Sequence, residues 1–117
     1  MIRLSVAILL CSASLFADDC VSYKDAAQLI GRTGCVSGKV EHVAHSQTGN
    51  TYLDFCADYR NCSFSAAVLH RASSKVGDLE ELEGRTIELR GAVRDYKGKP
   101  EILITDRSQI TVLPQKK

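Results

Sequence analysis

The sequence predicts a mainly β fold: a barrel of five strands in the order β-β-β-α-β-β, preceded by a short helix and an N-terminal export signal. Three observations predict this fold class. Apolar and polar residues alternate in several separate segments of the chain. Apolar residues recur at helical spacing between the third and fourth of these segments, and the cysteines fit an exported domain.

An export signal is predicted at the N-terminus. Residues 1–17 begin with one basic residue, Arg3, continue through an apolar core at residues 4–10, and end in small residues at Ala17. This core is shorter than the roughly 20 residues that cross a bilayer, and no later segment qualifies as a membrane span. We expect cleavage after Ala17 and a periplasmic or secreted domain at residues 18–117; a retained N-terminal helix is the alternative.

The mature chain is small and formally neutral. Removing 17 of the 117 residues leaves 100, enough for one small domain and too few for two. Only Arg3 is lost from the 15 basic residues and none of the 14 acidic residues, so the two charges balance. Bulk charge therefore does not attract this domain to nucleic acid or anionic lipid. The absence of Trp and the 6% aromatic content limit its stacking surfaces.

Four cysteines remain after Cys11 is removed with the signal. An even number in an exported chain of this size is typical of disulfides. Four cysteines allow three pairings, and the sequence favours the two local ones. These are Cys20 with Cys35, and Cys56 with Cys62.

A short helix is expected at the start of the mature domain. Ser22 stands before the segment "YKDAAQLI", with Asp25 three residues later, which is a capping-box pattern. Gly31 follows as the stop signal. The apolar stripe of this helix consists of Ala26, Ala27, Leu29 and Ile30.

Three strands are predicted next. The first covers residues 35–44, "CVSGKVEHVA", where alternation indicates one wet face and Gly38 predicts a bend or bulge. After the turn cluster "HSQTGN", alternation resumes in "TYLDF" and then in "SFSAAVL". These two segments are expected to form an antiparallel hairpin.

A helix and the last strands complete the pattern. Val76, Leu79 and Leu82 recur at helical spacing, which predicts a helix that ends at Gly84, although Gly77 weakens its first turn. The remaining strands are "RTIELRGAVRDY" (85–96), "EILIT" (101–105) after the turn "KGKP", and the short closing segment "SQITVL" (108–113).

Three strands, a helix and two strands are the order of the five-stranded OB barrel. An open sandwich would more often show about seven short strands and no central helix. The segments "GCVSGKVEHV", "YLDF", "FSAAV" and "LEGRTIELRGAVRDYKGKPEILITDRSQITVL" resemble the bacterial OB-fold proteins grouped with nucleic-acid-binding domains. The resemblance covers about residues 22–113. It implies the fold more directly than the nucleic-acid-binding function, because one fold hosts many functions.

The Cys56–Cys62 pair favours a staple over a metal or redox site. Five residues separate the two cysteines, whereas zinc sites usually space such pairs two to four apart, and His42 and His45 lie largely on opposite faces of a strand. A Cys-x-x-Cys motif at a helix start is absent from the sequence. A disulfide would hold the loop at residues 57–61 in one shape at the rim of the barrel, beside the usual ligand face of OB folds.

Single-strand binders combine basic grooves with exposed aromatic rings on which bases stack. The candidate ligand-binding residues of this type are Lys39, Tyr52, Tyr59, Arg60, Arg90, Arg94, Tyr96 and Lys97. Acidic residues alternate with them on the same predicted faces, at Glu41, Asp54, Asp58, Glu88 and Asp95. Alternating signs are typical of an ordinary solvated sheet face, so both interpretations stay open.

We expect no enzymatic activity, cofactor or metal site. The sequence has no Gly-rich phosphate loop and no His-Glu-x-x-His motif, and it is too short for a staphylococcal-type nuclease domain. Two hypotheses remain. The first is an exported OB module that binds single-stranded nucleic acid; the second is a periplasmic adaptor for a protein, an oligosaccharide or a small ligand.

Overall fold

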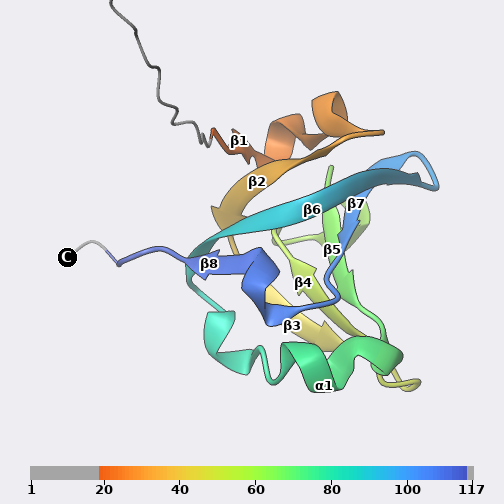
Figure 1. Cartoon of the computed structure of the whole chain (residues 1–117), viewed down its shortest axis with the longest axis vertical. Coiled ribbons are helices and arrows are strands. Elements are labelled where there is room, and N and C mark those ends of the chain that lie inside the picture. Colours follow the sequence, from red (N-terminus) through yellow and green to blue (C-terminus); the bar gives the residue numbers. More distant parts are fainter. Residues whose placement is uncertain (1–18, 116–117) are drawn as a thin grey trace, which may run out of the picture.

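The computed structural model describes residues 19–115, so the predicted export signal and its cleavage site lie outside the described residues. The described chain is mainly β, as predicted (Figure 1). Its strands are β1 (Val21–Ser22), β2 (Thr33–Lys39), β3 (His42–His45), β4 (Thr51–Asp54), β5 (Ser65–Val68), β6 (Thr86–Tyr96), β7 (Lys99–Leu103) and β8 (Ile110–Val112). Its helical elements are η2 (Tyr23–Leu29), η3 (Tyr59–Asn61), η4 (His70–Ala72), α1 (Ser73–Val76), η5 (Glu80–Leu82) and η6 (Arg107–Gln109), of which α1 is α-helical and the others are 3₁₀ turns.

The strands form one open mixed sheet in the order β1-β2-β6-β7-β5-β4-β3, with β8 paired to β6. The pairs β1–β2 and β5–β7 are parallel and the other strand pairs are antiparallel. The predicted closed barrel of five strands is therefore wrong. The predicted strand at residues 35–44 divides at Val40 and Glu41, whose N–H groups donate to the carbonyls of Arg85 and Asp54 respectively. β2 consequently pairs with β6, whereas β3 pairs with β4.

One apolar core lies inside the curved sheet. Its largest fully buried side chains are Phe55, Phe64, Leu53, Leu79, Leu82, Ile87, Leu89, Ile102 and Ile104. The rings of Phe55 and Phe64 meet edge to face with centroids 5.4 Å apart, an arrangement that aromatic pairs prefer. Apart from Leu79 and Leu82, these residues come from the predicted alternation, which places every second side chain of a strand on the inner face.

Gly38 does not form the predicted bend or bulge. The pairing of β2 with β6 runs through it without interruption, with Gly38 opposite Ile87. A Cβ atom at this position would lie 2.8 Å from ring carbons of both Tyr23 and Phe55. Glycine is therefore needed here because two aromatic rings pack against the strand backbone.

The first helical element is confirmed, but as a 3₁₀ helix with a narrower buried face. Ser22 caps it by accepting the N–H of Lys24, 3.1 Å from its Oγ. In a 3₁₀ helix, side chains three residues apart share a face. Ala26 is buried and Leu29 is half-buried on one such face, whereas Ala27 and Ile30 on the other are exposed, so the four-residue apolar stripe is wrong.

The segment between β5 and β6 is a series of short turns in place of the predicted helix. It lies at the lower end of the curved sheet in Figure 1. Gly77, with φ of 81°, ends α1 after one turn. Val76, Leu79 and Leu82 are nevertheless buried in the core, as their spacing predicted. The helical periodicity thus identified the inward-facing residues, while glycine interrupted the helix that would have carried them.

Two glutamates of this segment cover β3, which is the edge strand of the sheet. Glu83 Oε1 accepts the backbone N–H of Val43 at 3.0 Å. The Glu80 carboxylate contacts the imidazole of His45. The outer side of β3 is therefore partly occupied by carboxylates.

Both predicted disulfides are present. Cys20–Cys35 ties the N-terminal segment to β2, and Cys56–Cys62 spans the connection between β4 and β5. Among residues 19–115, none of the helical elements has the length and apolar character to cross a membrane.

Candidate ligand-binding face

A pocket of about 390 Å³ lies over β3, β4 and β5 and extends to the hairpin of β6 and β7. It is lined by Ala44, Tyr52, Asp54, Cys62, Phe64, Ser65, Ala66, Tyr96, Lys97 and Lys99. This volume falls within the range of small-ligand sites, which are about 300–1,000 Å³.

Alternation along β4 directs its polar residues to the pocket. Leu53 and Phe55 are buried in the core, so Tyr52 and Asp54 point to the opposite face. Antiparallel pairing sets Ala44 of β3 opposite Tyr52, and the small alanine leaves space beside the ring.

Asn50 fixes the position of the Tyr52 side chain. Its Nδ2 donates to the Tyr52 hydroxyl at 3.3 Å, while its Oδ1 accepts the backbone N–H of His70 at 2.9 Å. The N–H of Asn50 in turn donates to Ser46 Oγ at 3.1 Å. The loop between β3 and β4 is thereby connected both to the pocket and to η4, which restricts the Tyr52 ring.

The tip of the β6–β7 hairpin brings an aromatic ring and cations to the pocket. Lys97 and Gly98 have φ of 53° and 88°, the positive values of a tight two-residue hairpin turn. Tyr96 is 44% exposed. The guanidinium of Arg94 and the ammonium of Lys97 each lie 5.3 Å from the centre of the Tyr96 ring, within cation–π range.

A buried carboxylate neutralises Arg94. Glu101 is only 4% exposed, and its Oε1 accepts hydrogen bonds from Arg94 Nε at 2.9 Å and Nη2 at 2.7 Å. The Ser65 hydroxyl donates to the other carboxylate oxygen at 3.1 Å. Arg94 therefore positions the pocket wall, while Lys97 and Lys99 form no ion pair with any of residues 19–115.

Asp54 is the acidic group of the pocket. Burial raises the pKa of its carboxyl above the ordinary value of 3.8, and the nearby His42 opposes this shift to a smaller extent. The Asp54 side chain accepts no hydrogen bond from any of the described residues. It is a half-buried acceptor in a ligand pocket.

The structure brings together only part of the predicted site. Of the eight candidates, Tyr52, Tyr96 and Lys97 line the pocket, and Arg94 adjoins it through its contact with the Tyr96 ring. Sequence reasoning missed Lys99, although pairing across a short hairpin from Tyr96 could have indicated it. It also counted Asp54 against the site, where alternation with the buried Leu53 and Phe55 could have placed it in the pocket.

The other four candidates lie elsewhere or outside the description. Lys39 is exposed at the end of β2, and Arg60 donates to Asp58 in the loop closed by the second disulfide. The side chain of Tyr59 lies outside the described residues. Arg90 lies at the Cys20–Cys35 disulfide.

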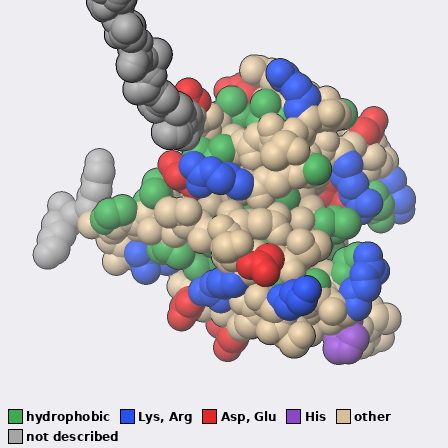
Figure 2. All heavy atoms as spheres, in the orientation of Figure 1, with side chains coloured by type: hydrophobic (Ala, Val, Ile, Leu, Met, Phe, Trp, Pro, Cys, Tyr) green, Lys and Arg blue, Asp and Glu red, His purple; other side chains and the backbone are tan. Residues whose placement is uncertain are grey.

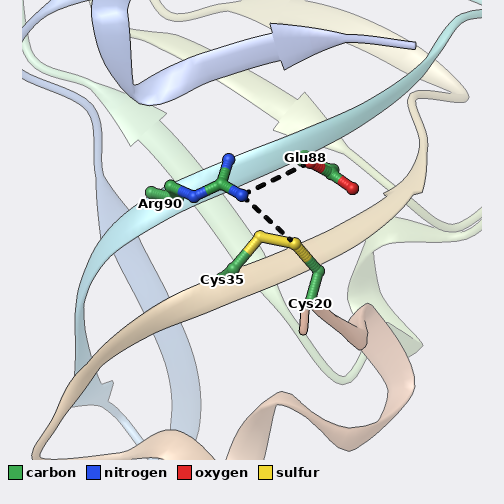
Figure 3. Close-up of a disulfide and its surroundings, with 4 residues drawn as sticks. All are labelled: Cys20, Cys35, Glu88 and Arg90. Carbon is green, nitrogen blue, oxygen red and sulfur yellow. Dashed lines mark hydrogen bonds and ion pairs between the residues drawn. A yellow bond between two sulfur atoms is a disulfide. The ribbon is translucent and has the colours of Figure 1, made fainter. Parts of the chain in front are cut away.

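The Cys20–Cys35 disulfide has two charged neighbours (Figure 3). Arg90 Nη2 lies 3.8 Å from Cys20 Sγ and 3.5 Å from Glu88 Oε1. The two sulfurs and a Glu88 oxygen lie within 4.8 Å of one another, a spacing that suits metal ligands. A metal requires thiolates, however, and both sulfurs are joined in the disulfide.

Charges of both signs share the molecular surface. Figure 2 shows Lys and Arg side chains scattered over one face, with Asp and Glu side chains between them. This pattern agrees with the formal net charge of the sequence, which is only +1. Any anion-binding site must therefore be local, because the surface in this view has no single large basic patch.

No family model and no curated protein matches this sequence. Solved structures match in fold. The chain is similar to an "OBody AM1L10 bound to hen egg-white lysozyme", with TM-score 0.59 and 16% identity over 89% of this chain and 100% of the other. It is also similar to asparaginyl-tRNA synthetase from Pyrococcus horikoshii, with TM-score 0.53 and 16% identity over 81% of this chain. These likenesses show an OB-like fold. The chain spans 23% of the synthetase.

Proposed function

We propose that this domain is an exported OB-type module that binds single-stranded nucleic acid at the pocket between β4 and the β6–β7 hairpin. The observation that carries the proposal is the meeting of Tyr52, Tyr96, Lys97 and Lys99 at one pocket. Tyrosine rings offer faces on which bases stack, and lysines contact phosphates without regard to sequence. The resemblance of the sequence to bacterial OB-fold proteins grouped with nucleic-acid-binding domains supports the same function.

The fold likeness to a tRNA synthetase adds support of a general kind. That protein acts on tRNA by its name, and this chain matches the fold of one part of it. The role proposed here is binding without catalysis, in the periplasm or outside the cell.

Binding of a fluorescent oligonucleotide to residues 18–117 with intact disulfides tests the proposal. We expect anisotropy to rise at low salt with both DNA and RNA strands, and the affinity to fall steeply with added salt. Lys97→Ala and Lys99→Ala should each reduce the salt slope by about 0.7, the value for one phosphate contact on a single strand. Lys75→Ala, on the exposed surface of α1, is the matched control. The absence of binding at low salt would exclude this function.

A second candidate function is an adaptor for a protein, a saccharide or a small ligand. The apolar part of the lining favours it, because Ala44, Phe64 and Ala66 offer a surface to which no phosphate is attracted. An OB-like chain bound to lysozyme also illustrates that this fold can hold a protein. This second function is favoured by two results together. The oligonucleotide does not bind at low salt, and the exported protein captures a ligand only when Tyr52 and Tyr96 are present.

A further inference from the structure

The Asp54 carboxylate lines the ligand pocket without a hydrogen-bond donor of its own. Asp54 is the last residue of β4 and lies on the same face as Tyr52, two residues earlier. None of residues 19–115 donates a hydrogen bond to its side chain. Two acceptor oxygens are therefore left for a ligand.

Three polar side chains in or beside the pocket, those of Ser65, Arg94 and Asn50, already donate to other groups. The Ser65 hydroxyl and the Arg94 guanidinium both donate to Glu101. The side-chain amide of Asn50 donates to the Tyr52 hydroxyl. None of these three groups donates to Asp54, and Lys97 and Lys99 of the pocket form no ion pair with it, so the carboxylate oxygens can accept hydrogen bonds from a ligand.

The surroundings of Asp54 make such a donor favourable. Burial removes part of the hydration of the carboxylate and raises its pKa. His42, its partner across the β3–β4 pair, opposes this effect but lies beside another carboxylate, with its Nδ1 3.4 Å from Glu83 Oε1. A hydrogen bond from a ligand would replace the lost water contacts.

We propose that Asp54 reads the Watson–Crick edge of one guanine base held in the pocket. This inference rests on the proposed single-strand binding and names the base. Guanine carries two adjacent donors on that edge, the N1–H and the N2 amino group, and a carboxylate can accept two parallel hydrogen bonds from such a pair. Adenine, cytosine and uracil each place an acceptor atom beside their donor, and that acceptor repels the carboxylate.

The rest of the pocket suits the remaining parts of a nucleotide. Tyr52 and Tyr96 supply rings for the faces of the base, and Lys97 and Lys99 supply charge for its phosphates. Asp54 adds selection among bases, which stacking and phosphate contacts do not provide.

The test compares oligonucleotides that differ at one base. Ten-residue deoxyuridine strands carry guanine, inosine or adenine at the centre, so that size and stacking are matched. We expect the guanine strand to bind about tenfold more tightly than the adenine strand, with inosine between them because it lacks the N2 amino group. Equal binding of the three strands overturns the assignment of Asp54 and leaves the proposed function intact. No binding of any strand at low salt overturns both.

Asp54→Asn is the variant that isolates the contact. It keeps the size of the side chain but presents one acceptor and one donor, so the preference for guanine over adenine should fall below about threefold. Glu41→Gln removes an equal charge at the β2–β3 junction, outside the pocket, and should keep the full preference. A guanine preference that persists in Asp54→Asn would contradict the proposal.

Free nucleotides separate the two sources of a guanine base. Guanosine monophosphate should compete with the labelled strand more strongly than adenosine monophosphate does. If it binds as tightly as the guanine strand, the free nucleotide is the ligand; if it binds at least about tenfold more weakly, the neighbouring phosphates of a strand contribute. Equal competition by the two monophosphates overturns the reading of guanine.

Discussion

Arg94 holds the buried carboxylate of Glu101 through two hydrogen bonds, 2.9 Å from Nε and 2.7 Å from Nη2, at the margin of the ligand pocket. The pair links β6 to β7 across their antiparallel register, where Arg94 is the direct partner of Glu101. The Arg94 guanidinium also lies 5.3 Å from the centre of the Tyr96 ring, which lines the pocket. Its loss should therefore affect both stability and ligand binding.

Arg94→Ala should lower the free energy of unfolding by about 1–3 kcal/mol, because it leaves Glu101 buried with only Ser65 as a donor. Arg94 is itself half-exposed, so water reaches the vacated site and keeps the effect below that of a fully buried pair. Urea unfolding measures the change. The double variant Arg94→Ala/Glu101→Ala should recover part of the loss, and a double variant less stable than Arg94→Ala would contradict this account.

The Asp54 carboxyl should make stability depend on pH. Its folded pKa is raised, so the folded state favours the protonated form, and the stability that this group contributes at low pH is lost as pH rises from 3.8 through the raised pKa. Asp54→Asn should thus unfold at a higher urea concentration than the wild type at pH 7, with the difference shrinking towards pH 3. His42 faces Asp54 across β3 and β4, so a His42→Gln background should enlarge the effect. A constant difference at all pH values would show that the carboxyl charge is not its cause.

Removal of the Cys56–Cys62 disulfide should lower stability by about 2 kcal/mol, and removal of Cys20–Cys35 by about 3 kcal/mol, since the second closes a longer loop in the unfolded chain. Paired cysteine-to-alanine variants measured by calorimetry without reductant compare the two. Only the first should also weaken ligand binding, because Cys62 lines the pocket. Detection of free cysteine thiols in the unreduced protein would contradict the presence of the two disulfides.

Gly38→Ala should destabilise the domain by about 1–3 kcal/mol through overpacking against Tyr23 and Phe55. Shortening one ring tests the cause: Gly38→Ala/Phe55→Leu should cost less than the sum of the two single variants. Additive losses in the melting temperature would indicate a backbone effect instead.

The sequence predicted the features that depend on local pattern. Alternation identified the strands β4, β5 and β6, and the locality of the cysteines indicated both disulfides. The division between β2 and β3 was not predictable, because the carbonyls that accept the N–H groups of Val40 and Glu41 belong to residues far away in the chain.

Only part of the candidate site was predicted from the sequence, because the rest depends on how the strands pair. Composition drew attention to Tyr52, Tyr96 and Lys97, which line the pocket. The sequence pattern expected the four-residue turn "KGKP", whereas Lys97 and Gly98 alone make the turn and bring Lys99 opposite Tyr96. A positive φ at a lysine is rare and is decided by the register of the whole hairpin.

The position of Glu83 also affects the self-association of this protein through the edge strand β3. An edge strand with free amide groups invites a strand from another copy to join the sheet, and such growth leads to fibrils. The amide of Val43 is already bonded to Glu83, and the imidazole of His45 contacts the carboxylate of Glu80. A second copy that approached β3 would encounter negative charge and an amide at Val43 that is already bonded, which disfavours the addition of its strand at this margin of the sheet.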